Sequence, residues 1–558
     1  MPSECPCTSM NDSTFKIYRL RNNESFRNDK LVTFKQSELI LGVSTIHIWY
    51  SLGTYYIYFS LNPTLPMQEH IRALIVIILM ALIGFAIAKK LAPKGIMPAE
   101  ISRWRNLWLA VVIAAFVAHN FWIYLILSGI FIFLSTTKDQ NKMALFFILL
   151  FVIPPLEIQV PGFGLVNYLF ALNHPRFITL IVLLPAALAI SQKNNFKFTK
   201  IWADKFLLLY ILLIFGLGLR DTTLTDALRL LFYSFTDIFL PYFVASRAIK
   251  DLSNMRTVLY AFVTSAVVLA FIAIFESGKQ WLLYNQLGVA LGTGDSIGNY
   301  LGRSGGLRAI ASLGHPIILG YFMTIAIGFY LYLSSTIQNK SIKKIGAILL
   351  GLGLFVPLSR GPWVGALAMF VTYLALGPSP IKKLGTLFIV GIFSLPILAM
   401  LPGGGKVMEL IPFVGQTEKG NIEYREQLFE NALIVIKNNL FFGSSNYLET
   451  PEMQAMIQGE GIVDVVNTYL SVALDTGIVG LSLFVGVFLA VILGVRKKLK
   501  RIKDYRQQQH LLGRSLLAII VSMMVTIATV SSIATVAIIY WSILGIGVAY
   551  TRIPEGEL

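Results

Sequence analysis

Charge and cysteine are both scarce in this chain of 558 residues. Only 13% of the residues are charged and 56% are hydrophobic, a composition that excludes a soluble multidomain enzyme. The only two cysteines, Cys5 and Cys7, lie close together in a polar N-terminal tail. Two thiols cannot complete a tetrahedral zinc site by themselves, and they provide no disulfide framework.

Motifs of soluble enzymes are missing as well. The glycine-rich stretch at 292–298 has the wrong spacing for nucleotide binding, and no strand precedes it. The sequence shows neither a His/Asp metal cluster nor a Ser-His-Asp set, and no internal repeat is visible. Residues 1–38 contain no apolar run before a cleavage site, so we expect a basic cytoplasmic tail rather than a secretory signal. No metal or other cofactor is expected.

Long uncharged runs dominate the rest of the chain. Many windows of about 15 to 20 residues lack any charge, which predicts an all-α, polytopic transmembrane helical bundle. We expect about 12 to 16 spans, since several runs are shorter than the ~20 residues of a perpendicular helix. The predicted spans lie near 39–61, 70–88, 107–118, 121–135, 143–153, 177–191, 206–218, 231–245, 257–275, 316–334, 343–357, 362–376, 384–401, 478–495, 515–531 and 532–550.

The distribution of basic residues predicts the orientation. The net charge of +17 is concentrated in short loops between apolar runs, which is typical of cytoplasmic loops and not of a nucleic-acid-binding patch. These loops lie at 89–105, 192–205, 246–256, 337–344, 377–383 and 496–514. When these loops are placed in the cytoplasm, both termini also lie on the cytoplasmic side, and the two longest polar loops face outward. The predicted division is a tail (1–38), an N-terminal bundle (39–275), an outer loop (276–315), transmembrane hairpins (316–401), a large outer helical loop (402–477) and C-terminal helices (478–558).

Arginines mark the outward face. Arg360, in the sequence PLSRGPWVG, lies between two apolar runs. An arginine at the lipid boundary is costly unless it pairs or snorkels, so it is a functional candidate, with a snorkelling anchor as the alternative. Arg308 lies in the outward loop that enters the next span, and Arg303 lies in the same loop. We expect Arg308 to be catalytic and Arg303 to bind substrate.

Arg425 belongs to the charged outer helix predicted at 423–439. Glu423, Glu426 and Glu430 could neutralise it, so a solvated surface helix is the alternative to a role at the site.

His315 and Arg229 are further candidates for substrate binding. His315 precedes Pro316 and is expected at a helix N-terminus, which favours anions; a capping or packing role is the alternative. Arg229 and Asp237 are eight residues apart and share a helix face. They would form either a polar strip into the membrane or a structural ion pair with each other.

The end of the large outer loop carries the last candidates. Asn467, Ser471 and Asp475 recur every four residues and form one polar helix face, so Asn467 and Asp475 are candidates for substrate binding. Asp464 and Glu460 precede this face, and either could act as a general base if desolvation raised its pKa. Ordinary loop carboxylates are the alternative.

Several arginines on one outward face suggest the handling of an anion rather than hydrolysis. Guanidinium groups bind phosphates bidentately and keep their charge. A membrane-resident anion that is reached from outside would be a lipid phosphate or diphosphate.

These stretches resemble the O-antigen ligase/polymerase family, the bacterial Wzy-like integral membrane glycosyltransferases. The stretches that carry the resemblance are LRAIASLGHPIILG, LSRGPWVGALAMF, YREQLFENALIVIKNNLFFG and NTYLSVALDTGIVGL, which together cover 302–484, about a third of the chain. The N-terminal spans resemble exopolysaccharide-type relatives. The family is similar to GT-C transferases, which are helical bundles that act at the outer face on sugars linked to undecaprenyl diphosphate, without metal or nucleotide.

The resemblance implies roles for individual residues. Arg308, Arg360 and Arg425 would bind the diphosphate and stabilise it as it leaves, while an acceptor sugar hydroxyl attacks the anomeric carbon with inversion. Ligases of the family carry a His before the Asn of an HN-x9-G-x-x-G pattern, whereas this chain has Val466 before Asn467. This departure favours a polymerase of exopolysaccharide repeat units over a ligase.

Two alternatives remain open at this point: a ligase to a lipid or protein acceptor, and a transporter or flippase of lipid-linked oligosaccharide. A transporter would be expected to show duplicated halves and ionisable groups at mid-membrane. The expected location is the bacterial inner membrane, with a flippase and chain-length or export proteins as possible partners.

Overall fold

The computed structural model divides the chain into two units, Met1–Gln68 and Glu69–Leu558. It describes residues 46–52, 55–61, 69–136, 141–164, 166–192, 201–294, 297–298, 300–303, 305–400, 408, 419–458, 461–531 and 534–555. The predicted tail at 1–38 and the candidate base Glu460 lie outside these residues.

A β-hairpin replaces the first predicted span. Strands β1 (Ile46–Leu52) and β2 (Tyr55–Leu61) pair antiparallel, with Ile46 opposite Leu61. The span expected near 39–61 is therefore wrong over these residues. The two strand sequences, IHIWYSL and YYIYFSL, are rich in β-branched and aromatic residues, which favour strands over helices.

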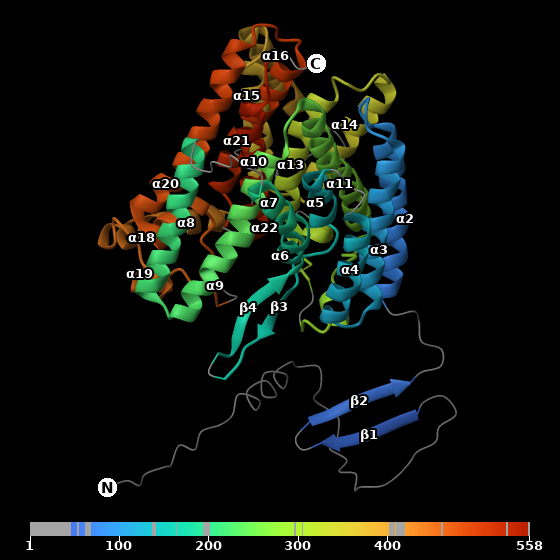
Figure 1. The fold of residues 1–558 in the computed structure, drawn as a ribbon, viewed down its shortest axis with the longest axis vertical. Coiled ribbons are helices and arrows are strands. Elements are labelled where there is room, and N and C mark those ends of the chain that lie inside the picture. The colour runs from blue at the N-terminus through green and yellow to red at the C-terminus, as the bar shows by residue number, and fades with distance from the viewer. Residues whose placement is uncertain are drawn as a thin grey trace. The chain divides into compact units, whose positions relative to one another are not determined.

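The second unit is the helical bundle that the sequence predicts (Figure 1). Within the part of the chain that the structure describes, nine helical segments are long and apolar enough to cross a membrane. They are α2 (Glu69–Lys90), α6–η1–α7 (His174–Ser191), α8 (Trp202–Asp221), α9–η3–α10 (Leu224–Ala248), α11 (Leu252–Lys279), α13 (Pro316–Leu333), α20 (Thr468–Arg501), α21 (Gln508–Ile527) and most of α22 (Ala534–Arg552).

The remaining predicted spans also fold as helices. They are α3 (Pro98–Val117), α4 (Phe121–Thr136), α5 (Lys142–Leu150), α14 (Lys340–Phe355), α15 (Arg360–Ala375) and α16 (Pro380–Met400). The all-α polytopic fold class is confirmed.

Short elements and one helical segment cap the bundle. They are the hairpin β3 (Glu157–Pro161) and β4 (Tyr168–Asn173), α12 (Leu287–Ala290), the hairpin β5 (Gly302–Arg303) and β6 (Gly306–Leu307), the turn η4 (Ala311–Leu313), and α18 (Lys419–Asn438), η5 (Tyr447–Glu449) and α19 (Pro451–Gln454). We call residues 419–466, of which 459–460 are not described, the α18–α19 segment. It shares a small apolar core with the start of α20, in which Leu428, Val435 and Met453 pack with Leu474 of α20.

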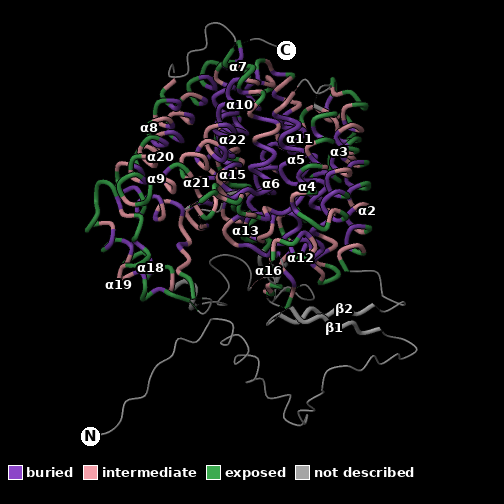
Figure 2. The backbone as a smooth tube through the Cα atoms, turned by 60° about the horizontal axis from the view of Figure 1, so that its bottom comes forward, coloured by how far each residue is buried: buried purple, intermediate pink, exposed green. Residues whose placement is uncertain are grey.

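Helix α11 forms the centre of the core, and Figure 2 shows its buried course. It packs against α2, α5, α13 and α14. Phe262 of α11 lies 4.7 Å from the ring of Phe322 in α13, and Phe322 lies 4.3 Å from Phe151. At Gly84 of α2 an added Cβ would lie only 2.8 Å from the Cα of Val268, so glycine allows α2 and α11 to approach closely.

Polar contacts bring the basic loops at 246–256, 377–383 and 496–514 to one end of the bundle, which we call the basic-loop end. Arg552 donates to the carbonyl of Ser246 at 3.1 Å, and Arg514 donates to that of Tyr373 at 2.7 Å. Lys498 donates to the carbonyl of Tyr550 at 2.6 Å. These contacts join the ends of α10, α15, α20, α21 and α22, the end at which Figure 1 also draws α16 and the C-terminus.

Candidate functional site

The turn before α15 holds two of the predicted arginines. Arg308 donates from Nε to the carbonyl of Pro357 at 3.2 Å and from Nη2 to the hydroxyl of Ser359 at 3.0 Å. Arg303 donates from Nη1 to the carbonyl of Leu358 at 2.7 Å. Leu358 has a φ of 49°, a left-handed conformation that side chains other than glycine rarely adopt. Two arginines from the loop before α13 thus converge on this strained turn.

Arg360 is the first residue of α15, directly after this turn. Its neighbour Gly361 lies against the loop between α21 and α22, because an added Cβ would be only 2.5 Å from the Oγ1 of Thr529. The start of α15 therefore lies between the Arg303/Arg308 loop and the α21–α22 loop. The partial positive charge of a helix N-terminus adds to that of the nearby guanidinium groups.

The α21–α22 loop collects the candidates from the α18–α19 segment. Arg425 of α18 donates from Nη2 to the carbonyl of Thr529 at 3.4 Å. The hydroxyl of Ser531 donates to a carboxylate oxygen of Asp464. At the same loop, Thr468 at the start of α20 donates to the carbonyl of Val530 at 2.9 Å. We call Arg303, Arg308, Arg360 and Arg425 the arginine cluster, and the bundle end that carries it the arginine end.

His315 caps α13 next to this cluster. Its Nδ1 accepts a hydrogen bond from the backbone N–H of Ile317 at 3.3 Å. Burial, aided by the positive charge of Arg308, lowers the pKa of His315 from 6.5 to about 4, although the carboxylate of Asp464 opposes the shift. The imidazole is therefore neutral at neutral pH, and its titration is coupled to both Arg308 and Asp464.

Asn467 also serves as a helix cap. Its Oδ1 accepts hydrogen bonds from the backbone N–H groups of Tyr469 at 2.9 Å and Leu470 at 3.3 Å, at the start of α20. The side-chain oxygen of Asn467 therefore has a local structural role as the N-terminal cap of α20.

Asp475 lies two helical turns beyond Asn467, or about 12 Å along α20 at 1.5 Å per residue. It is therefore separate from the arginine cluster. The backbone of α20 breaks immediately afterwards at Gly477, which has φ 65° and ψ −168°. Glycine adopts a positive φ without a steric penalty, which allows α20 to bend at this position.

Arg229 contacts the β3–β4 hairpin and not the arginine cluster. It forms an ion pair with Asp226, donates from Nε to the carbonyl of Leu169 at 3.0 Å, and stacks on the ring of Tyr168 with 3.7 Å between its Cζ and the ring centroid. The ion pair considered between Arg229 and Asp237 is wrong. The closer neighbour three residues away pairs with Arg229 instead.

Arg176 pairs with Asp237, and sequence patterns gave no signal for this pair. The guanidinium lies 3.0 Å from Asp237 and 3.2 Å from Glu157, and Arg176 and Asp237 are 7% and 6% exposed. It also stacks on Tyr233, with 3.9 Å from Cζ to the ring centroid. Asp237 lies in the π-helical turn η3 (Phe235–Phe239). Arg176 thereby fastens the β3–β4 hairpin to the bundle.

The sequence also gave no signal for Ser359, Thr529 and Ser531. Their contacts with Arg308, Arg425 and Asp464 span 51, 104 and 67 residues of sequence, so only the fold reveals them. Among the described residues, no group of three or more His, Cys, Asp or Glu side chains is arranged to hold a metal ion.

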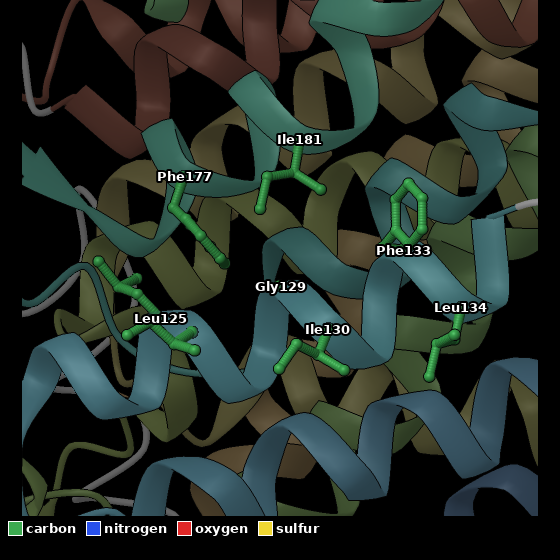
Figure 3. A pocket seen from close by; sticks show the side chains of 8 residues that line it. Leu125, Gly129, Ile130, Phe133, Leu134, Phe177 and Ile181 are labelled. Carbon is green, nitrogen blue, oxygen red and sulfur yellow. The ribbon is translucent and has the colours of Figure 1, made fainter.

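An apolar groove of about 460 Å³ lies elsewhere, between α4 and α6–η1. Figure 3 shows Leu125, Ile130, Phe177 and Ile181 around it. None of its lining side chains carries a polar or titratable group. The groove therefore offers no chemistry for a reaction centre.

One comparison with known proteins bears on the site. Residues 345–485 match a family model described as O-antigen ligase, and no curated protein matches the chain. The matched residues contain Arg360, Arg425, Asp464, Asn467 and Asp475, whereas Arg303, Arg308 and His315 precede them. The match confirms the resemblance inferred from the motifs: over residues 345–485 the chain is similar to the O-antigen ligase/Wzy-like family.

Proposed function

We propose that this protein is a glycosyltransferase that polymerises oligosaccharide repeat units carried on a polyprenyl diphosphate such as undecaprenyl diphosphate. The observation that carries the proposal is the arginine cluster, in which segments far apart in the sequence meet at the end opposite the basic loops. By the positive-inside rule, the basic-loop end is cytoplasmic and the arginine end faces outward. In a bacterium this corresponds to the outer face of the inner membrane.

The arginines provide the positive charge that the departure of a lipid diphosphate requires. The acceptor sugar hydroxyl attacks the anomeric carbon of the donor, and the bond from that carbon to the diphosphate oxygen breaks. Negative charge then develops on the leaving diphosphate. Guanidinium groups positioned in advance by the turn at 357–359 and by the N-terminus of α15 stabilise that charge more than they stabilise the bound substrate.

Asp464 is the base that the geometry favours. Its carboxylate is oriented by Ser531 at the loop that also holds Arg425, and it accepts the proton of the attacking hydroxyl. His315 is the weaker candidate, because its Nδ1 already accepts a hydrogen bond from the backbone N–H of Ile317. Its neutral side chain can instead hydrogen-bond to the substrate.

The decisive experiment uses purified full-length protein and synthetic diphosphate-linked repeat units. We expect chains longer than one repeat unit and stoichiometric release of polyprenyl diphosphate. In cells that lack the protein, single repeat units should still be displayed outside while long chains are lost. Repeat units trapped inside would indicate a flippase and overturn the proposal.

A ligase is the second candidate, favoured by the description of the matched family. The absence of a histidine before Asn467, where Val466 stands, argues for the polymerase. Transfer of a single preformed glycan to a different lipid or protein acceptor, without chain growth, would favour the ligase.

A further inference from the structure

A backbone-to-backbone contact joins the α18–α19 segment to α20. The N–H of Ile478 donates to the carbonyl of Leu440 at 2.9 Å, and the N–H of Ser444 donates to the carbonyl of Leu474 at 2.9 Å. Helix α20 can make these bonds only because its own ladder is broken at Gly477. The short stretch 440–444 is therefore fixed against the kink.

Two glycines permit this approach. An added Cβ on Gly477 would lie 2.3 Å from the carbonyl carbon and oxygen of Phe441, and one on Gly443 would lie 2.4 Å from the carbonyl oxygen of Leu474. Both glycines also have positive φ angles, 65° and 60°. No side chain other than hydrogen fits at either position, so the relative position of the two backbones is tightly fixed.

The kink lies at the depth of the membrane boundary. The part of α20 after the kink, residues 478–501, is about 36 Å long at 1.5 Å per residue, enough to cross the roughly 30 Å of a bilayer core. Its basic residues begin at Arg496, and counting about 20 residues back from there places the other boundary close to Gly477.

Helix α8 locates the same boundary independently. It ends at Asp221, and its last turn contacts the stretch directly: Arg220 donates to the carbonyl of Gly443 at 3.1 Å, and Asp221 accepts from the N–H of Ser445 at 3.4 Å. Helix α18 also packs against α20, and Figure 1 draws α18 and α19 close to both α20 and α8. Residues 440–445 therefore lie at the level where two spans leave the bilayer.

The side chains at this level are large and apolar. Phe441 is 63% exposed, Phe442 48% and Leu440 45%, and Ile478, which is bonded to Leu440, is 43% exposed on α20. A contiguous apolar surface of this kind marks an interaction site. Because it continues the exposed apolar surface of a membrane-spanning helix, hydrocarbon chains of the bilayer fit it best. Phenylalanine at the boundary also gains free energy by burying its ring below the headgroups.

We propose that Leu440, Phe441 and Phe442 form a membrane anchor that inserts into the leaflet at the arginine end. The anchor holds the α18–α19 segment, and with it Arg425 and Asp464, at a fixed height above the lipid. This inference does not rest on the proposed transferase activity, since it follows from the spans and the backbone contacts alone.

Spin labelling of the full-length protein in proteoliposomes tests the anchor. Cys5→Ser and Cys7→Ser remove both native cysteines, and single cysteines then replace Phe441 or Phe442. Collision rates of the label are measured with oxygen, which concentrates in the bilayer, and with a nickel chelate, which stays in water. Matched controls are Leu493→Cys, 62% exposed in the apolar part of α20, and Ala455→Cys, exposed just after α19.

Labels at 441 and 442 should collide with oxygen as frequently as the label at 493. Their collisions with the nickel chelate should be at least about fivefold less frequent than those of the label at 455. Nickel collisions as frequent as those at 455 would place the residues in water and overturn the proposal. Exclusion of both reagents would also overturn it, in favour of a contact with a second copy or another protein. Each labelled variant is accepted only if it unfolds at the temperature of the cysteine-free parent.

Discussion

Two groups of arginines lie toward the same end of the bundle and differ in what they contact. Arg176 and Arg229 are held by carboxylates and tyrosine rings at the β3–β4 hairpin. Arg303, Arg308 and Arg425 direct their described hydrogen bonds to carbonyl and hydroxyl oxygens around the start of α15. A contacting carboxylate offsets a guanidinium charge locally, and several guanidinium groups around one turn add their charges into a shared positive field. The first arrangement fastens a hairpin, and the second suits an anionic substrate.

The largest effect is expected at the hairpin. Arg176→Met should lower the free energy of unfolding by about 3–5 kcal/mol, because it leaves the buried carboxylate of Asp237 without its ion-pair partner. Thermal unfolding in detergent measures the loss. Replacing both residues, as Arg176→Met with Asp237→Leu, should recover part of the stability. A single variant as stable as the native protein would contradict the assignment of Arg176 as a structural fastener.

Substitutions in the arginine cluster should lower the rate of the transfer step rather than the stability of the protein. Arg308→Ala and Arg360→Ala should each slow the transfer step by roughly 100- to 1,000-fold, the cost of removing one preorganised donor at a developing charge. Single-turnover assays with diphosphate-linked repeat units measure the rate. Arg308→Lys should retain part of it. The matched control is Arg501→Ala at the basic-loop end, whose exposed side chain faces Glu555; equal losses in both variants would remove Arg308 from the site.

The pKa of His315 reports the electrostatic field of the arginine cluster. Its folded-state pKa of about 4 lies below the ordinary 6.5, so between these pH values the unfolded chain binds a proton that the folded chain does not. Stability should therefore fall as the pH drops from 6.5 to 4, and His315→Asn should flatten that part of the curve.

Arg308→Ala should raise the pKa of His315, while burial, the larger cause, keeps it below 6.5. The ¹⁵N chemical shifts of the imidazole, identified by their loss in His315→Asn, measure the change. An unchanged pKa would show that Arg308 does not act on this residue.

The smallest effect is expected for Arg229→Lys. Lysine keeps the charge beside Asp226 but loses the stacking on Tyr168 and part of the hydrogen bonding to the hairpin carbonyls. Unfolding should become easier by about 0.5–1 kcal/mol, with no change in the transfer rate. A loss of rate at native stability would place Arg229 in the site after all.

The sequence by itself determined the membrane fold and which residue types to examine. Uncharged runs of span length leave a helical bundle as the stable arrangement in lipid, and basic loops indicate one end of it. The motifs around Arg308, Arg360 and Arg425 pointed to an anionic lipid substrate. The sequence did not reveal the hairpin at 46–61, whose apolar length resembles that of a span.

Only the tertiary structure decided which polar residues meet. Arg229 and Asp237 share a helix face in the sequence, yet Asp237 pairs with Arg176, which is 61 residues away. Likewise, Ser531 reaches Asp464, and the stretch around Phe441 reaches the kink at Gly477. Periodicity describes one helix at a time, whereas these partners are chosen by how separate helices pack, because buried charges and broken backbone ladders must find a partner wherever the fold provides one.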